Sequence, residues 1–183
     1  MRRALAFRYV RRVEFHPEDY GPHVARILAL AGGGTRLMPL VRCGCVACEA
    51  SDALKDEDVN NAAVKAGLYV HCGCWDQAHE LADSVHNPNG YFWHGIVHRQ
   101  EPDAANSAYW FRMTGRHAIF PRLAAEAASA GYGRGTHWDP FAFIDFCETA
   151  RQSPGSAGEK LAERVQLLEW QLLFDHCARS ENG

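Results

Sequence analysis

The chain has 183 residues, of which 47% are hydrophobic and 22% charged, and its formal net charge at pH 7 is −3. These proportions are typical of a globular domain with a sizeable core, and the charge gives no reason to expect binding to nucleic acid or to an acidic membrane. No segment approaches the roughly 20 apolar residues that a membrane-spanning helix needs. We therefore expect one cytoplasmic domain over residues 1–183.

Residues 1–15 form a basic arm. The first twelve, MRRALAFRYVRR, include five arginines and no acidic residue. Their longest stretch without arginine, ALAF, is too short for the apolar part of a secretory signal, so this segment predicts a solvated or partner-contacting arm. Without a secretory signal, the seven cysteines are expected to be reduced thiols.

A first helix is predicted to begin at Pro17, because proline is favoured in the first turn and two acidic residues follow it near the positive end of the helix. The three glycines at 32–34 end this helix. Residues 35–55 contain Pro39 and three closely spaced cysteines, which indicate irregular structure.

Residues 58–117 predict two consecutive helical hairpins. In the first, Asp58 caps a helix that Gly73 closes, and a second helix follows over 75–86. The segment Asn87-Pro88-Asn89-Gly90 is expected to be the turn between the hairpins.

The second hairpin is predicted to have helices over 91–99 and 104–114, joined by a turn at 100–103. The spacing resembles that of tetratricopeptide-type hairpins, although the full signature is absent. Gly67 and Gly95 are expected to let the second helix of each hairpin lie close.

The C-terminal part, 139–179, predicts two more helices after a glycine-rich connection at 129–138. Asp139 and Pro140 provide a cap and a first-turn proline for one, and Ser156 with Glu159 forms a capping box for the last. The last helix is apolar over much of its circumference, which indicates that it is wedged between neighbours. The fold class is therefore mainly α.

His94 and His98 are four residues apart on a predicted helix, so both imidazoles lie on one face about one turn apart. That spacing suits two ligands of zinc or another divalent metal ion. The zinc-protease motif has a glutamate directly after its first histidine, whereas here Gly95 occupies that position. Further candidate ligands are His79, Glu101, Asp103 and His117. The alternative is that the imidazoles donate hydrogen bonds to carboxylates and backbone.

The same region also predicts a partly buried polar pocket, because arginine pairs with carboxylates or binds anionic ligands. Its candidate ligand-binding residues are His79, His94, His98, Arg99, Glu101, Asp103, Asn106, Tyr109 and Arg112. The structural alternative is that Arg99 pairs with Asp103 around the turn, while the neighbouring aromatic rings belong to the core.

The clustered cysteines suggest a third kind of site. Cys45, Cys48, Cys72 and Cys74 supply four sulfurs, the number in a structural zinc site, although the spacing Cys72-Gly73-Cys74 is narrower than usual. The alternative is a set of small buried residues together with a few exposed thiols.

The segment YFWHGIVHRQEPDAANSAYWFRMTGRH resembles a motif of a family of uncharacterised, mostly bacterial proteins, approximately W-H-G/A-I-x-H-R-R-E-x-D-x-x-N-A-x-Y-W-F-R-R-x-G-x-H-P. The matching residues are Trp93, His94, Gly95, Ile96, His98, Arg99, Glu101, Asp103, Asn106, Tyr109, Trp110, Phe111, Arg112, Gly115 and His117, and the chain departs from the motif at Gln100, Ser107, Met113 and Ala118. The resemblance implies a helical fold with a polar centre at this motif and supplies no reaction.

Three functions remain open on these grounds. The first is a helical protein whose polar pocket binds a small anionic ligand or a protein partner. The second is a metal-dependent enzyme, such as a hydrolase, in which His94 and His98 hold the ion and Glu101 or Asp103 acts as base. The third is an interaction module stabilised by zinc at the cysteines. The residues do not determine the oligomeric state.

Overall fold

The computed structural model describes residues 13–180, so most of the predicted basic arm lies outside the described residues. Within this range all regular secondary structure is helical, which confirms the prediction of a mainly α fold. No described helix is both long and apolar enough to cross a membrane. The elements are the 3₁₀ helix η1 (Pro17–Tyr20) and the α-helices α1 (Pro22–Leu30), α2 (Cys48–Asp56), α3 (Ala62–Cys72), α4 (Trp75–Ser84), α5 (Pro88–Gln100), α6 (Ala104–Thr114), α7 (Phe120–Ala130), α8 (Pro140–Ala150) and α9 (Ala157–Arg179).

Five helices begin at a polar side chain that accepts a hydrogen bond from a free N–H group of the first turn. These caps are Asn61 for α3, Asn87 for α5, Asp103 for α6, Asp139 for α8 and Ser156 for α9. The caps of α8 and α9 are those the sequence predicts. The prediction that Asp58 caps α3 is wrong, because the cap is Asn61, three residues later in the sequence.

The segment predicted as a turn between the hairpins starts a helix instead. The Asn87 side chain accepts hydrogen bonds from the N–H groups of Asn89 (2.9 Å) and Gly90 (3.2 Å). Pro88 has no N–H group, so it is suited to the first turn, where no backbone partner is available. The residues typical of a turn therefore also form a complete helix start, and α5 is one turn longer than predicted.

Three other differences concern the ends and number of helices. The first predicted helix is divided by Gly21, which has a φ of 85°, into η1 and α1. The cysteine-containing segment predicted to be irregular includes α2 from Cys48 onward. Phe120–Ala130, where no helix was predicted, form α7, which Gly131 ends in the left-handed conformation.

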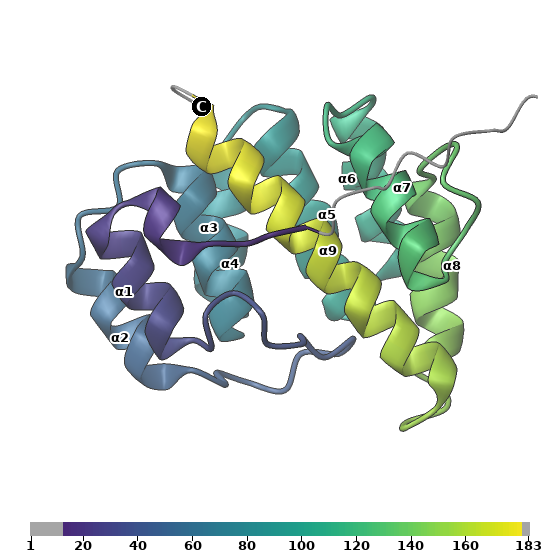
Figure 1. Ribbon diagram of the computed structural model, residues 1–183, viewed down its shortest axis with the longest axis horizontal. Helices are drawn as coiled ribbons and strands as arrows, with labels where there is room; N and C mark the ends of the chain where they lie inside the picture. Colours follow the sequence, from purple (N-terminus) through teal and green to yellow (C-terminus); the bar gives the residue numbers. More distant parts are fainter. Residues whose placement is uncertain (1–12, 181–183) are drawn as a thin grey trace, which may run out of the picture.

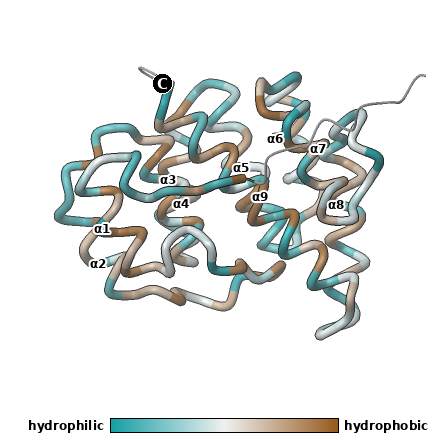
Figure 2. The backbone as a smooth tube through the Cα atoms, in the orientation of Figure 1, coloured by the Kyte–Doolittle hydropathy of each residue, from teal (hydrophilic) through white to brown (hydrophobic). Residues whose placement is uncertain are grey.

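The last helix, α9, crosses the molecule diagonally between two groups of helices, α1 to α4 on one side and α6 to α8 on the other (Figure 1). It contacts α3, α7 and α8, and Trp170 and Phe174 on it are fully buried. The Trp170 indole N–H donates to the carbonyl of Gly67 on α3 at 2.8 Å. Along the helices, hydrophobic stretches alternate with hydrophilic ones (Figure 2), as expected for faces that pack against this central helix.

Two glycines permit close helix packing, and one of them does so against unexpected partners. A Cβ atom at Gly95 would lie 2.8 Å from the ring of Phe111 on α6, so α5 and α6 approach closely at this point. A Cβ atom at Gly67 would instead meet Trp93 on α5 at 2.7 Å and Phe174 on α9 at 3.1 Å. The predicted role of Gly67 toward the next helix, α4, is therefore wrong.

Candidate metal centre

Three histidines from two adjacent helices bring their ring nitrogens together. His79 lies on α4, and His94 and His98 lie one turn apart on α5. One ligand atom from each residue lies within 4.8 Å of the others, and no other set of three histidine, cysteine or acidic residues within 13–180 does so. His94 and His98 are buried and His79 is half-buried, so His79 is the most exposed of the three.

The rings of the cluster are held by stacking. The His94 ring lies between Trp110, at 3.9 Å between centroids, and His98, at 5.0 Å, with interplanar angles of 13° and 12°. His79 stands perpendicular to both histidines. Because Trp110 comes from α6, three helices determine the orientation of the ligand atoms. From the sequence, Trp110 was grouped with neighbouring aromatic rings that were expected to belong to the core. In the structure its ring instead stacks on His94, a candidate metal ligand.

His94 has few polar partners of its own. Its Nε2 atom lies 2.9 Å from Nε2 of His79, and its Nδ1 atom is buried with no hydrogen-bond partner among the described residues. Burial, reinforced by the neighbouring His79 and His98, lowers the pKa of His94 to about 4. The ring is therefore neutral at pH 7, which is the form that binds metal ions.

His98 contacts a carboxylate and an amide. Its Nδ1 atom lies 3.2 Å from Oε2 of Glu101, and the Asn106 side-chain nitrogen lies 3.1 Å from its Nε2 atom. Burial lowers the pKa of His98, and Glu101 opposes that effect. His94 and His98 are both buried, but among the described contacts only His98 has a carboxylate oxygen within 4 Å of a ring nitrogen.

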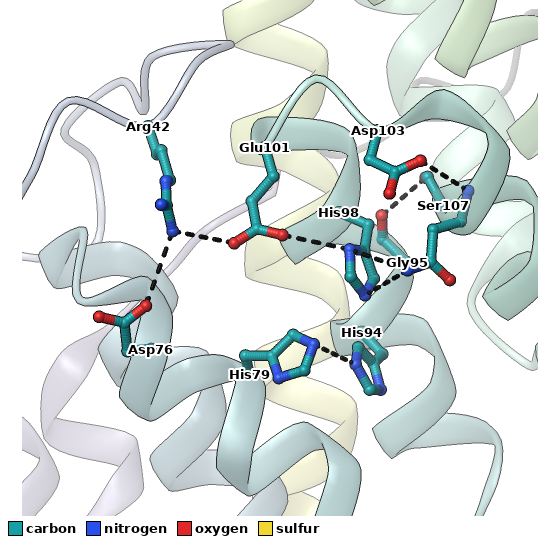
Figure 3. A network of polar contacts seen from close by, with 10 residues as sticks. Arg42, Asp76, His79, His94, Gly95, His98, Glu101, Asp103 and Ser107 are labelled. Carbon is teal, nitrogen blue, oxygen red and sulfur yellow. Dashed lines mark hydrogen bonds and ion pairs between the residues drawn. The ribbon is translucent and has the colours of Figure 1, made fainter.

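A polar network extends from His98 to the surface (Figure 3). The Arg42 guanidinium lies 2.9 Å from Oε1 of Glu101 and 3.6 Å from the Asp76 carboxylate. The backbone N–H of Arg42 also donates to the carbonyl of Gln100 at 2.9 Å, which holds this loop residue beside the end of α5. Sequence reasoning missed Arg42 and Asp76, because nothing local relates Arg42 to a glutamate 59 positions away.

Arg99, a predicted ligand-binding residue, lies in the core away from the three histidines. Its guanidinium forms a bidentate ion pair with Glu169 of α9, with 3.2 Å between Nη1 and Oε1, and lies 4.7 Å above the ring of Phe143. Arg99 and Glu169 are both fully buried. The alternative prediction, in which Arg99 pairs with Asp103, is therefore wrong. The positive charge of Arg99 is neutralised by Glu169 inside the molecule.

The remaining predicted pocket residues separate. Asp103 caps α6 by accepting from the N–H of Asn106 at 3.0 Å. Tyr109 is 48% exposed, and Arg112 is exposed on the outer face of α6. His117 is buried elsewhere, with its Nε2 atom 2.9 Å from Oδ1 of Asn89. Of the predicted polar set, the structure therefore brings together the three histidines, Glu101 and Asn106.

Of the four cysteines predicted as zinc ligands, Cys45, Cys48 and Cys74 line one cavity, whereas Cys72 lies in the core. Cys72 is fully buried, and burial raises the pKa of its thiol to about 12. Cys45 and Cys48 are exposed, and Cys74 lies beside Cys45. All seven thiols are free, and the described residues contain no sulfur-based set of three that meets the distances of the histidine cluster.

Comparisons of this chain with protein-family models, with curated proteins and with solved structures found no match.

Proposed function

We propose that His79, His94 and His98 bind one divalent transition-metal ion, zinc being the best fit, and that this ion makes the protein a metal-dependent enzyme of the hydrolase type. The observation that carries the proposal is the convergence of three histidine ligand atoms within 4.8 Å of one another. Three protein ligands with a fourth position for water or substrate are typical of catalytic zinc, whereas structural zinc has four protein ligands.

The dimensions of the cluster support this proposal. Two nitrogens that bind one tetrahedral zinc ion at 2.0–2.1 Å are about 3.3 Å apart. The Nε2 atoms of His79 and His94 are 2.9 Å apart, so this pair needs a shift of only a few tenths of an ångström. The three ligand atoms lie within 4.8 Å of one another, so the ion would also have to draw the third ligand closer. A metal ion would also satisfy the lone pairs of these facing nitrogens, which otherwise have only each other.

The surroundings of His98 are of the kind that support a metal ligand. A ligating histidine usually donates its other ring N–H to a carboxylate, which fixes the tautomer and orients the ring. Glu101 is placed to accept from Nδ1 of His98, and Arg42 holds Glu101 from the other side. The Nε2 atom of His98 then carries the lone pair that would bind the metal. The Asn106 amide nitrogen, which lies 3.1 Å from this atom, would have to move away to make room for the ion.

The arrangement revises the roles that sequence reasoning gave to the acidic residues. Glu101 is engaged by His98 and Arg42, and Asp103 is engaged as a helix cap, so neither is free to act as the base. A bound zinc ion would supply water activation and polarisation of a carbonyl or phosphoryl oxygen. The chain itself contributes the orientation of the three imidazoles, and the half-buried His79 is the most exposed of them.

Two other functions have less support. Binding of a small anionic ligand would need an available cation beside the histidines, but Arg42 is paired with Glu101 and Arg99 with Glu169, while Arg112 is an exposed residue of α6. A zinc-stabilised interaction module would need four sulfurs in one place, and Cys72 is in the core instead.

The test replaces His79, which is half-buried and can be removed at little cost to the core. We expect the purified parent protein to contain about one equivalent of zinc by elemental analysis, and the His79→Ala variant to lose most of it while keeping its helical circular dichroism. His137→Ala, which replaces an exposed histidine outside the cluster, is the matched control and should retain the metal.

Activity is measured separately, with zinc-loaded protein and a panel of esters, amides and phosphate esters. Turnover that His79→Ala and a chelator both abolish would support the enzyme. If the protein binds zinc but turns over none of these substrate classes, it is a metal-binding protein and the hydrolase proposal is refuted. A parent protein that neither contains zinc nor gains thermal stability from added zinc would refute the metal centre itself.

A further inference from the structure

We propose that Cys45 and Cys74 form a thiol–disulfide exchange site that takes a low-molecular-weight disulfide as its substrate. The two Sγ atoms are 3.2 Å apart and are not bonded. A disulfide bond is about 2.05 Å long, so a shift of little more than 1 Å between the sulfurs would join them. The pair lies outside the histidine cluster, and the proposal does not depend on the proposed metal.

Backbone contacts hold the two cysteines together. The N–H of Val46 donates to the carbonyl of Cys72 at 2.9 Å, which fixes the loop that contains Cys45 against the end of α3. Gly73 has a φ of 77°, and a Cβ atom there would lie 2.8 Å from the carbonyl oxygen of Gly44. The loop therefore lies directly against the turn between α3 and α4, and the two sulfurs face each other because of how their backbones pack.

A cavity gives a small molecule access to this pair. It has a volume of about 660 Å³ and is lined by Cys45, Cys48 and Cys74 together with charged side chains, among them Arg42 and Asp52. Cys45 is exposed and is the sulfur that an entering disulfide reaches first, whereas Cys74 is 8% exposed and lies behind it. Charges of both signs around the cavity suit a zwitterionic, amino-acid-derived disulfide.

Cys48 is a third thiol beside this pair. It is the first residue of α2, and its thiol donates to the carbonyl oxygen of Cys45 at 3.5 Å. A hydrogen bond with the Cys45 side chain raises the pKa of the Cys48 thiol, which reduces its share of thiolate. Cys74 is therefore the expected partner of Cys45, even though Cys45 and Cys48 are closer in sequence.

The exchange proceeds in two displacement steps. The Cys45 thiolate attacks one sulfur of the substrate, so a mixed disulfide forms and one substrate thiolate leaves. The Cys74 thiolate then attacks the Cys45 sulfur, the Cys45–Cys74 bond forms, and the second substrate thiolate leaves. The two protons lost by the cysteines are taken up by the two leaving thiolates. The protein dithiol is thus oxidised by two electrons, and the disulfide is reduced to two thiols.

The test incubates reduced full-length protein with oxidised glutathione in the presence of a chelator, and maps the products by mass spectrometry of peptides. We expect the parent protein to release two glutathione molecules and to form Cys45–Cys74 as its main disulfide. Cys74→Ser should stop at a mixed disulfide on Cys45. The Cys45→Ser variant should react with oxidised glutathione at least about tenfold more slowly than the parent protein, because Cys74 is shielded.

The matched control is Cys43→Ser, which removes another exposed thiol two residues from Cys45 and should behave as the parent protein does. A stable glutathione adduct on the parent protein, or Cys45–Cys48 as its main disulfide, would overturn the proposal. A third outcome would also overturn it: zinc that is lost in the Cys45→Ser variant but retained in the His79→Ala variant. The sulfurs would then serve as metal ligands.

Discussion

At the scale of single residues, the main feature is that two buried histidines, His71 and His94, have no carboxylate partner among the described residues. His94 lies between rings, and His71 stacks on Trp170 at 4.4 Å with both ring nitrogens buried and unpartnered among the described residues. Such surroundings disfavour the charged imidazolium. The identity of the candidate ligands could be predicted, because helical spacing relates His94 to His98. Their partners could not, because Arg42 and Trp110 reach the cluster through tertiary packing.

Acid is expected to destabilise the protein through these histidines. In the unfolded chain histidine has a pKa near 6.5. Burial lowers the pKa of His71 to about 3 and that of His94 to about 4, with nearby positive groups adding to the effect. The unfolded state therefore binds more protons between pH 6.5 and 4, so this contribution is complete above pH 6.5 and is lost as the pH falls.

The measurement is the melting temperature of metal-free protein from pH 7 to 4.5. We expect it to fall, and to fall less steeply in His71→Phe, which keeps a flat ring against Trp170 without a titrating group. An equal slope in the parent and in His71→Phe would show that His71 does not bind a proton on unfolding.

At the scale of elements, several helix starts and stops could be predicted from the sequence, whereas helices α2 and α7 could not. Asp139, Ser156 and Gly73 act as predicted, because a cap depends on residues within one turn. Helix α2 was missed because its sequence, CEASDALKD, is short and includes several weak helix formers. Such a helix is stabilised mainly by packing, here against α1 and α3, which local patterns do not contain.

The close approach of α5 and α6 gives a prediction about Gly95. Gly95→Ala would place a Cβ atom 2.8 Å from the buried ring of Phe111, so the helices must separate. We expect the free energy of unfolding to fall by about 1–3 kcal/mol in urea titrations. Zinc affinity should fall with it, since α5 and α6 together orient His94.

The control for this prediction is Gly158→Ala in the first turn of α9, where an added Cβ atom would meet only Ser156 Oγ, at 3.7 Å. That change should be neutral or stabilising by up to about 1 kcal/mol, because alanine is the better helix former. Equal effects at both positions would mean that the Gly95 contact does not limit packing.

At the scale of the whole molecule, the buried ion pair between Arg99 and Glu169 joins elements that lie far apart in the chain. It links α5 to α9, and the Arg99 guanidinium also covers Phe143 of α8. The carboxylate partner could not be predicted, because 70 positions separate it from Arg99 and Asp103 is nearer in sequence. What the sequence did indicate was a last helix buried between neighbours, which α9 is.

Breaking this pair should be more harmful than removing it. Arg99→Met leaves the Glu169 carboxylate buried without its cation, and we expect a loss of about 3–5 kcal/mol in the free energy of unfolding. The double variant Arg99→Met/Glu169→Leu should recover most of that loss, because neither charge remains. Arg112→Met, which replaces an exposed arginine, should stay within about 0.5 kcal/mol of the parent. Single variants as stable as the parent would show that the pair is solvated.

The same long-range pair has a consequence for how the chain folds during synthesis. Residues emerge from the ribosome at about 5–20 per second, so Glu169 follows Arg99 by roughly 4–14 s. Until then the Arg99 guanidinium must remain hydrated, and the face of α5 that later receives α9 stays open. The segments that carry His79, His94 and His98 are therefore synthesised before the core beneath them can be completed, and their final packing has to wait for α9.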